Sequence, residues 1–336
     1  MRLKSALRRG VAAAVIAGIV VSSGIPAYAK TWNIADGDIT VKGASDESGN
    51  YNNVKQGEKD FEKDEGETVI TGESDKNTVT IDTSKGDVDV TFDGLKIDVS
   101  GKKEGDGSGD GPARESNAAV TVKGDHDAAI ELDGDNELKS GDYNAGLEKN
   151  GHESEGTLTI KDDNGKDGSL TAEGGFGGAG IGGGIESTGS NITIRGGTIE
   201  AVGGSNAAGI GDGAGRASDD TDDPNPGDLY ICGDAEVTAK AGSQMTDAKA
   251  PAIGGSYGEV PTENLSDDEH KVTGGRLTRL NADGTVMEGM GYDYTSTPKP
   301  QPDDDEDDDD DIDDEDGDIN PKMEKAITIM GIAAGV

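Results

Sequence analysis

The sequence predicts an all-β protein, a right-handed parallel β-helix with three strand faces and about six coils. Three observations carry the prediction: a recurring small-residue run with an Ile-Gly pair, short strands that alternate apolar and polar residues, and aliphatic positions that keep one order in every repeat. Aromatic residues are 3% of the chain and glycine accounts for 55 residues, which favours a thin core of aliphatic ladders. A disordered chain would not keep three aliphatic registers, and a fixed order counts against the β-sandwich, the main alternative.

The first 29 residues have the features of an export signal. An apolar run covers residues 11–21, and Ala27-Tyr28-Ala29 supplies a small-x-small cleavage site. The start of the chain is positively charged through Arg2, Lys4, Arg8 and Arg9. A retained membrane helix is the alternative, but the apolar run is short for a span. We therefore expect export by the general secretory route and a mature chain that begins at Lys30.

Charge and cysteine content exclude several classes of protein. The chain has 69 acidic residues against 30 Lys and Arg, and 14 of the acids lie between Asp303 and Asp318. Such a surface repels nucleic acid and anionic membranes. Cys232 is the one cysteine of the sequence, so no internal disulfide framework is expected.

The repeats are recognised from their small-residue runs at 179–184, 208–213 and 251–256. Aligning outward from these runs predicts three ladders of inward-facing apolar residues. The first is Val79, Val120, Leu147, Ile181, Ile210 and Ile253. The second is Val90/Phe92, Ile130/Leu132, Leu158/Ile160, Ile192/Ile194 and Leu229/Ile231. The third is Ile97, Leu138, Leu170, Ile199 and Val237.

Long polar segments follow the first ladder in successive repeats, at 148–156, 185–190, 214–227 and 257–270. We call them the first-corner loops. Because repeats stack, these loops should lie side by side along one edge, and loops on a rigid scaffold are where function usually sits. They are the predicted working edge.

Segments 69–81 and 90–101, together with the Ala-Gly-Ile-Gly runs, resemble the glycine-rich parallel β-helix repeats of Gram-positive cell-surface proteins. The resemblance covers about residues 67–256 and implies no defined activity. The chain is similar, more distantly, to the clostridial calcium-dependent carbohydrate-binding β-helix family. That second resemblance implies polysaccharide binding with bound calcium, but no ligand motif transfers residue by residue.

Calcium is the one candidate cofactor. Acidic residues cluster in two first-corner loops, and carboxylates with flexible backbone oxygens suit a cation that takes six to eight oxygen ligands. The alternative is a solvated acidic loop, which is the commoner outcome for such a run. The candidate metal ligands are Asp219, Asp220, Asp222, Asp223, Asp267, Asp268 and Glu269.

No catalytic or cofactor-binding residue is predicted. A glycoside hydrolase would need two carboxylates held across a groove, and the outward positions of the second ladder do not supply such a set. They are Thr91, Glu131, Thr159, Thr193 and Tyr230. Trp32 and Tyr230 are candidates for stacking on sugar rings, although Trp32 also suits a cap on the N-terminal end of the core.

The expected organisation is an export signal at 1–29, the β-helix at 30–291, a Pro-rich and acidic disordered linker at 292–320, and the start of a membrane anchor at 321–336, the only expected membrane contact. We expect a secreted or cell-surface protein that binds extracellular carbohydrate or another cell-surface ligand, or mediates adhesion, without catalysis and without nucleic acid. The alternatives are a structural spacer or display rod, and a polysaccharide lyase or hydrolase of the pectin-active β-helix type.

Overall fold

The computed structural model describes residues 29–47, 49–101, 117–215, 228–243, 250–255, 258–259, 270–288 and 292–293, all within the compact unit Met1–Lys299. In these ranges η2 (Ile34–Asp36), a three-residue 3-10 turn, is the one helical element, so the all-β prediction is confirmed. No helix in the described ranges is long and apolar enough to cross a membrane. The expected export signal up to residue 28, the expected linker after residue 293 and the expected anchor lie outside them, whereas Tyr292 and Asp293, expected in the linker, form a strand.

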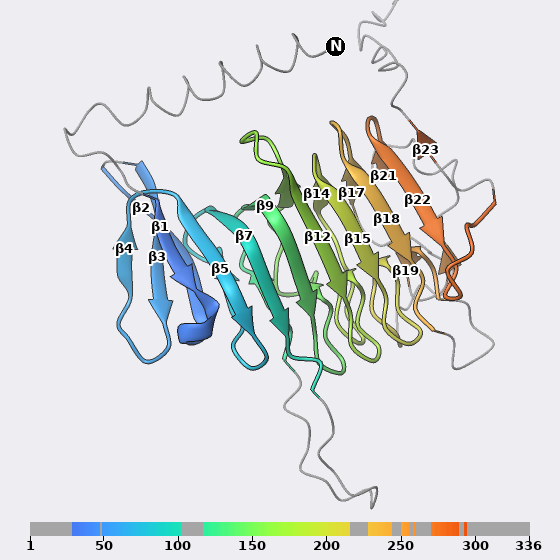
Figure 1. Ribbon diagram of the computed structural model, residues 1–336, viewed down its shortest axis with the longest axis horizontal. Helices are drawn as coiled ribbons and strands as arrows, with labels where there is room; N and C mark the ends of the chain where they lie inside the picture. The colour runs from blue at the N-terminus through green and yellow to red at the C-terminus, as the bar shows by residue number, and fades with distance from the viewer. Residues whose placement is uncertain are drawn as a thin grey trace, which may run out of the picture. The chain divides into compact units, whose positions relative to one another are not determined.

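The described strands form two sheets in which successive repeats pair in parallel (Figure 1). The larger sheet has 13 described strands, and we call it the first sheet. Its main path is β21 (His270–Val272), β17 (Leu229–Ile231), β14 (Ile192–Ile194), β11 (Leu158–Lys161), β9 (Ala128–Lys139), β12 (Gly168–Glu173), β15 (Thr198–Val202), β18 (Glu236–Lys240), β22 (Arg276–Leu280) and β23 (Tyr292–Asp293). β7 (Val88–Asp98) pairs with β9, β5 (Thr68–Ser74) with β7, and β1 (Lys30–Asn33) with β5.

The second sheet carries the first ladder and has 10 strands among the described residues. Their order is β20 (Gly258–Glu259), β19 (Ile253–Gly255), β16 (Ile210–Gly211), β13 (Ile181–Gly182), β10 (Leu147–Glu148), β8 (Val120–Lys123), β6 (Val79–Asp82), β2 (Ile39–Asp46), β3 (Gly49–Gln56) and β4 (Glu62–Asp64).

Antiparallel strands cover both described ends of the second sheet and one end of the first, at β22. β3 turns back along β2, and β4 along β3, while β20 and β23 turn back along β19 and β22. An exposed parallel edge is a template for pairing with another chain, and such strands cover it. The sequence patterns did not predict these antiparallel strands.

The first ladder is confirmed in full. Parallel pairing places its six residues opposite one another in the expected order, and Ile39 adds a seventh opposite Val79. Each of the seven side chains exposes at most 1% of its surface. Every repeat therefore contributes at least one aliphatic residue to this face of the core, and β2, β6 and β8 add Val41, Ile81 and Val122.

The second and third ladders are confirmed except at one step, between β9 and the strands β11 and β12. There the observed pairs are Leu158–Ala128, Ile160–Ile130, Leu170–Asn136 and Ala172–Leu138. Ile160 was predicted to pair with Leu132, and Leu170 with Leu138, so both predictions were wrong by two residues. Side chains alternate between faces along a strand, so a two-residue shift keeps the same residues inside. The apolar pattern cannot detect such a shift.

Asn136 takes a position in the third ladder where an aliphatic residue would be expected, and it is 2% exposed. Its side chain accepts a hydrogen bond from the Leu95 backbone N–H at 2.8 Å and donates one to the Ser169 carbonyl at 3.0 Å. β7 and β9 lose register between Asp93 and Lys96. The Asn136 side chain thus serves as the hydrogen-bond partner of backbone groups where the ladder is interrupted.

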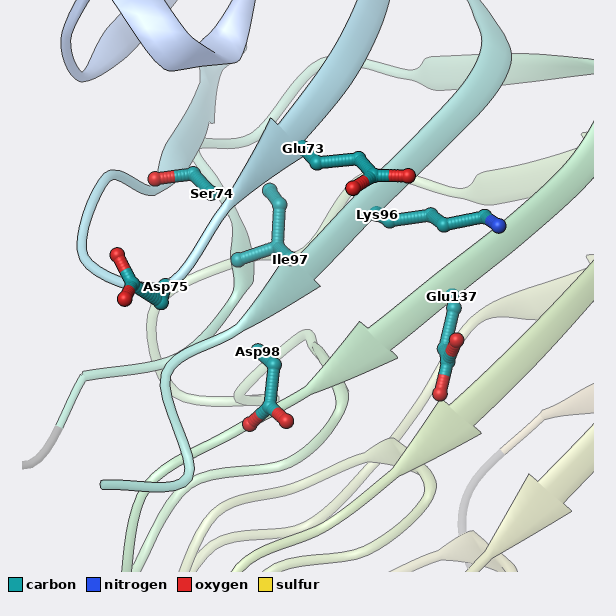
Figure 2. Close-up of a pocket in the computed structure, with 7 residues that line it drawn as sticks. All are labelled: Glu73, Ser74, Asp75, Lys96, Ile97, Asp98 and Glu137. Carbon is teal, nitrogen blue, oxygen red and sulfur yellow. The ribbon is translucent and has the colours of Figure 1, made fainter. Parts of the chain in front are cut away.

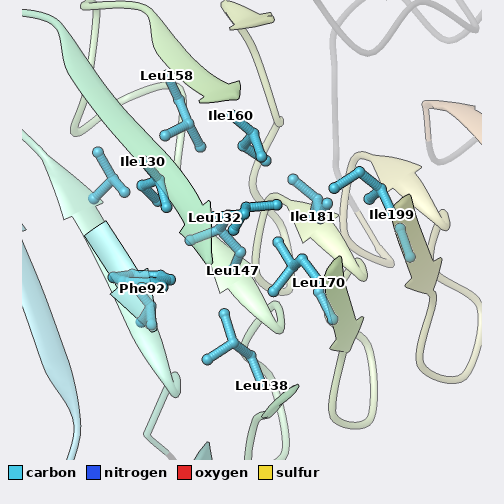
Figure 3. Close-up of a cluster of buried hydrophobic side chains, with 14 of the residues drawn as sticks. Phe92, Ile130, Leu132, Leu138, Leu147, Leu158, Ile160, Leu170, Ile181 and Ile199 are labelled. Atoms are coloured by element: carbon cyan, nitrogen blue, oxygen red, sulfur yellow. The ribbon is translucent and has the colours of Figure 1, made fainter. Parts of the chain in front are cut away.

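The inward side chains of the three ladders gather into one core (Figure 3). Glycine follows the aliphatic residue of the first ladder in β13, β16 and β19. At Gly182 φ is 131°, and a Cβ atom would lie 2.1 Å from the Gly211 carbonyl oxygen. A side chain cannot be accommodated there, which explains the Ile-Gly pair.

Candidate functional site

The seven candidate calcium ligands, Asp219, Asp220, Asp222, Asp223, Asp267, Asp268 and Glu269, lie outside the described residues. Calcium binding by these acids therefore stays a prediction. Within the described ranges, no group of three or more His, Cys, Asp or Glu side chains is arranged to hold a metal ion.

The first-corner loops lie side by side where they are described, as predicted. The Gly151 backbone N–H donates to the Thr188 carbonyl at 2.9 Å, and the Glu186 N–H donates to the Ala214 carbonyl at 2.9 Å. Ser154 and Ser187 are buried among these loops. The described part of this edge is consequently a hydrogen-bonded layer between repeats.

The corrected register brings Glu131 and Asp133 beneath the loop that joins β11 to β12. Glu131 Oε1 accepts hydrogen bonds from the Asp163 and Asn164 backbone N–H groups at 2.9 and 3.0 Å. Burial raises the pKa of Glu131, and the Lys161 ammonium, 3.3 Å from Oε2, opposes that rise. Asp133 accepts from Asn164 Nδ2 at 2.6 Å. These carboxylates hold the loop on the strand, and this is a structural role.

A polar hollow of about 450 Å³ lies at the ends of β5, β7 and β9 (Figure 2). In register, Lys96 stands between Glu73 and Glu137, and Figure 2 shows the three side chains on neighbouring strands at the hollow. The remaining lining residues are Ser74, Asp75, Ile97 and Asp98. The hollow has no aromatic wall, so it offers charge but no surface on which a sugar ring could stack.

An exposed aromatic pair lies where the chain passes from the first sheet to the second; we call it the aromatic corner. The side chains of Tyr143 and Phe176 are 50% and 40% exposed, and their rings meet edge to face with centroids 6.0 Å apart. The Tyr143 backbone N–H donates to the Phe176 carbonyl at 2.7 Å, which joins the corners of two successive repeats.

Tyr143 has a left-handed backbone, with φ of 73°. It lies four residues before Leu147 of the first ladder, and the residues four before Ile181 and Ile210 are Gly177 and Asn206. Those two have φ of 79° and 61°. Glycine and asparagine tolerate this conformation, whereas a bulky residue there is an outlier. The corner therefore keeps an exposed aromatic side chain at a position that is sterically unfavourable for it.

A second hollow of about 330 Å³ adjoins Phe176. Glycine backbone lines much of it, together with the Glu173 and Lys240 side chains. Two serines of successive repeats also line it, with the hydroxyls of Ser205 and Ser243 2.8 Å apart. The aromatic corner thus borders a surface of hydroxyls, backbone amides and one charge of each sign.

Two buried charged side chains follow the aromatic corner in sequence. Glu148 is 6% exposed, and burial raises its pKa to about 7, against the opposing hydrogen bonds from Ala145 and Asn150. Lys149 is fully buried, and burial lowers its pKa to about 8. Its ammonium donates to the Ser154 and Ser190 carbonyl oxygens, each at 2.9 Å. The two side chains are therefore held by different partners.

Sequence reasoning proposed other aromatic residues for sugar stacking. Trp32 is 3% exposed and donates from Nε1 to Asp64 at 3.0 Å, so it is unable to stack on a sugar. It lies in β1, at the N-terminal limit of the first sheet, which suits the alternative expectation that Trp32 caps the N-terminal end of the core. Tyr230 is partly exposed on β17. The sequence signal for the aromatic corner is that Tyr143 stands where the following repeats have Gly177 and Asn206.

In comparisons with known proteins, no family model, curated protein or solved structure matches this chain.

Proposed function

We propose that this chain is an exported, cell-surface protein whose repeats wind into a right-handed, three-sided parallel β-helix that binds extracellular carbohydrate without catalysis. Support for the winding comes from the route of the chain. It passes through one strand of the second sheet and then two of the first, as in β13, β14 and β15, followed by β16, β17 and β18. Each strand pairs in parallel with its counterpart. Three strand faces around one core are what a β-helix requires.

The carbohydrate proposal rests on the aromatic corner. Aromatic rings offer an apolar face to the C–H groups of a sugar, and hydroxyl and charged groups beside them satisfy its hydroxyls. Tyr143 and Phe176 supply the rings, and Ser205 and Ser243 supply hydroxyls in the adjoining hollow. With a formal net charge of −39, the chain would repel polyanions, so a neutral polysaccharide is the proposed class.

Surface display is proposed from the sequence. The features of an export signal at 1–29 and the mostly apolar segment at 326–336 both favour it. The acidic run at 303–318 would then hold the β-helix away from the membrane, since like charges extend a chain.

The test is binding of the full mature chain to cellulose, xylan, mannan, β-glucan, chitin and polygalacturonate, with calcium and with EDTA. Tyr143→Asn introduces the residue found at the equivalent position two repeats later, Asn206. Phe176→Ser introduces the residue found one repeat later, Ser205. Each substitution should lower affinity for a neutral polysaccharide about fivefold, since one aromatic contact contributes about 1 kcal/mol.

Phe61→Ser is the matched control, because Phe61 is 43% exposed and lies in the segment between β3 and β4. It should leave affinity unchanged. Failure of the folded wild-type chain to bind any of these polysaccharides would contradict the proposal and favour the spacer role. If calcium raises the affinity of wild type, and this increase is lost when the candidate acids at 219–223 are replaced, the result would support the calcium prediction.

A further inference from the structure

The repeat that carries Tyr143 departs from its neighbours at a second position. The residue after Leu147 is Glu148, and its register partners in the following repeats are glycines, Gly182, then Gly211 and Gly254. A buried carboxylate and an exposed aromatic residue thus replace small residues in one and the same repeat.

Glu148 contacts the turn that presents the aromatic pair. Its Oε2 atom accepts a hydrogen bond from the Ala145 backbone N–H, two residues after Tyr143, at 3.1 Å. Its Oε1 atom accepts from Asn150 Nδ2 at 3.2 Å. Both carboxyl oxygens therefore act as acceptors in the folded chain.

Asn150 carries the connection into the next repeat. Its Oδ1 atom accepts from the Gly184 backbone N–H at 2.9 Å. The residue after Gly184 is Ile185, whose N–H donates to the Tyr143 carbonyl at 2.8 Å. A closed set of contacts links the Glu148 carboxyl with Tyr143 from both sides.

A proton on Glu148 weakens this set, because it makes the carboxyl a poorer acceptor and adds a donor that needs an acceptor of its own. An ionised carboxylate only accepts, whereas a protonated one has an O–H that must donate. If Oε1 carries the proton and it faces Asn150, the Asn150 amide turns its oxygen toward Glu148, and the Gly184 N–H then loses its acceptor. If Oε2 carries it, the bond from Ala145 weakens. Protonation therefore loosens one side of the corner.

The charges around Glu148 do not neutralise it. The Glu153 carboxylate opposes its ionisation, and the neighbouring Lys149 ammonium is turned to the Ser154 and Ser190 carbonyl oxygens. Together with burial, this environment keeps the pKa of Glu148 near 7. A small change of pH around neutrality would change its charge.

We infer that Glu148 is a proton-sensitive positioning residue for the aromatic corner. Ionised, it holds the turn that presents Tyr143 and Phe176, and protonated, it releases the turn and weakens carbohydrate binding. This inference rests on the proposed binding of carbohydrate at that corner.

The first readout needs no ligand. In the full mature chain labelled with nitrogen-15, the amide resonance of Ala145 is followed against pH. It should titrate with a midpoint near that of Glu148, and the Gly184 amide should titrate with it. In Glu148→Gln both titrations should vanish. Amide shifts that stay constant from about pH 5.5 to about pH 8.5 would overturn the inference, because a carboxylate that accepts from an amide changes its resonance on protonation.

The second readout is affinity for soluble xylan, mannan and β-glucan at about pH 6 and about pH 8. Wild type should bind at least about fivefold more weakly at the lower pH, the low end of usual coupling between sites. Glu148→Gln should bind at both pH values as weakly as wild type does at the lower one. Glu155→Gln is the matched control, since Glu155 is an exposed acid of the same loop and is not among the groups that shift the pKa of Glu148, and it should keep the pH dependence.

The outcomes separate the two proposals. Binding that is the same at both pH values in wild type, or a Glu148→Gln variant that keeps the full pH dependence, overturns only the role of Glu148. Failure of wild type to bind any of the three polysaccharides at either pH overturns the proposed function, and this inference with it.

Discussion

Substitution of Gly182 by alanine tests the stacking of repeats in the second sheet. At Gly182, φ is 131°, and a Cβ atom would lie 2.1 Å from the Gly211 carbonyl oxygen. Carbon and oxygen atoms pack at about 3.5 Å, so the neighbouring backbone would have to retreat by more than about 1 Å. That movement would break the 2.9 Å hydrogen bond from the Gly183 N–H to the same oxygen.

The expected loss has two parts. The unfavourable φ for alanine costs about 1–3 kcal/mol, and a buried amide left without its acceptor costs about 1–3 kcal/mol more. Gly49→Ala isolates the first part, since φ at Gly49 is 121° and nothing lies within 4 Å of its Cβ position. The two variants should therefore differ by about 1–3 kcal/mol in free energy of unfolding.

The assay is urea denaturation, followed by far-ultraviolet circular dichroism and by Trp32 fluorescence. Trp32 is the single tryptophan and is 3% exposed, so its emission reports the N-terminal end of the core. Two probes are needed because repeat proteins can unfold in parts. If Gly182→Ala lost no more stability than Gly49→Ala, the register between β13 and β16 would be wrong.

Three further outcomes follow from particular side chains. Tyr143→Asn should change the free energy of unfolding by less than about 1 kcal/mol in urea denaturation, because relief of the left-handed strain offsets the lost ring contact; a large loss would mean that Tyr143 serves packing. Because burial raises the pKa of Glu148 from 4.5 to about 7, its contribution to stability is fully present below about pH 4.5 and is lost as pH rises through about 7, by up to about 3 kcal/mol. The free energy of unfolding, measured at about pH 4.5 and about pH 8, should fall by this amount more in wild type than in Glu148→Gln. An equal pH dependence of the two proteins would contradict the prediction. Phe92→Ala should cost about 3–5 kcal/mol by the same assay, since Phe92 is fully buried between β5 and β9; a loss under about 1 kcal/mol would show that the core collapses around the cavity.

Much of the fold could be predicted because it repeats. The first ladder needed only aliphatic residues in a fixed order, and all of its predicted pairs are observed. The pairing of Ile160 with Ile130 could not be predicted, because a two-residue shift preserves the inward face. The closing strands β3, β4, β20 and β23 were also missed, since they occur once and have no repeat to compare with.

The candidate site was harder to predict than the fold. The sequence directed attention to acidic first-corner loops, whose described parts bond to one another across repeats. Tyr143 is exposed, its backbone is left-handed, and its N–H is bonded to Phe176 of the next repeat. Nothing in the local sequence around Tyr143 indicates that conformation.

By itself, the sequence determined the periodic part of this protein: which aliphatic residues face inward, and the corners where glycine must stand. Those properties are local or recur at each repeat, so alternation and spacing reveal them. Only the tertiary structure decided which residues meet across repeats, that Glu131 faces Lys161, and that Glu148 is buried beside the turn of Tyr143. These depend on hydrogen bonds between segments 30 to 40 residues apart, such as Leu147 to Gly180 and Gly151 to Thr188, and such contacts leave no local pattern in the sequence.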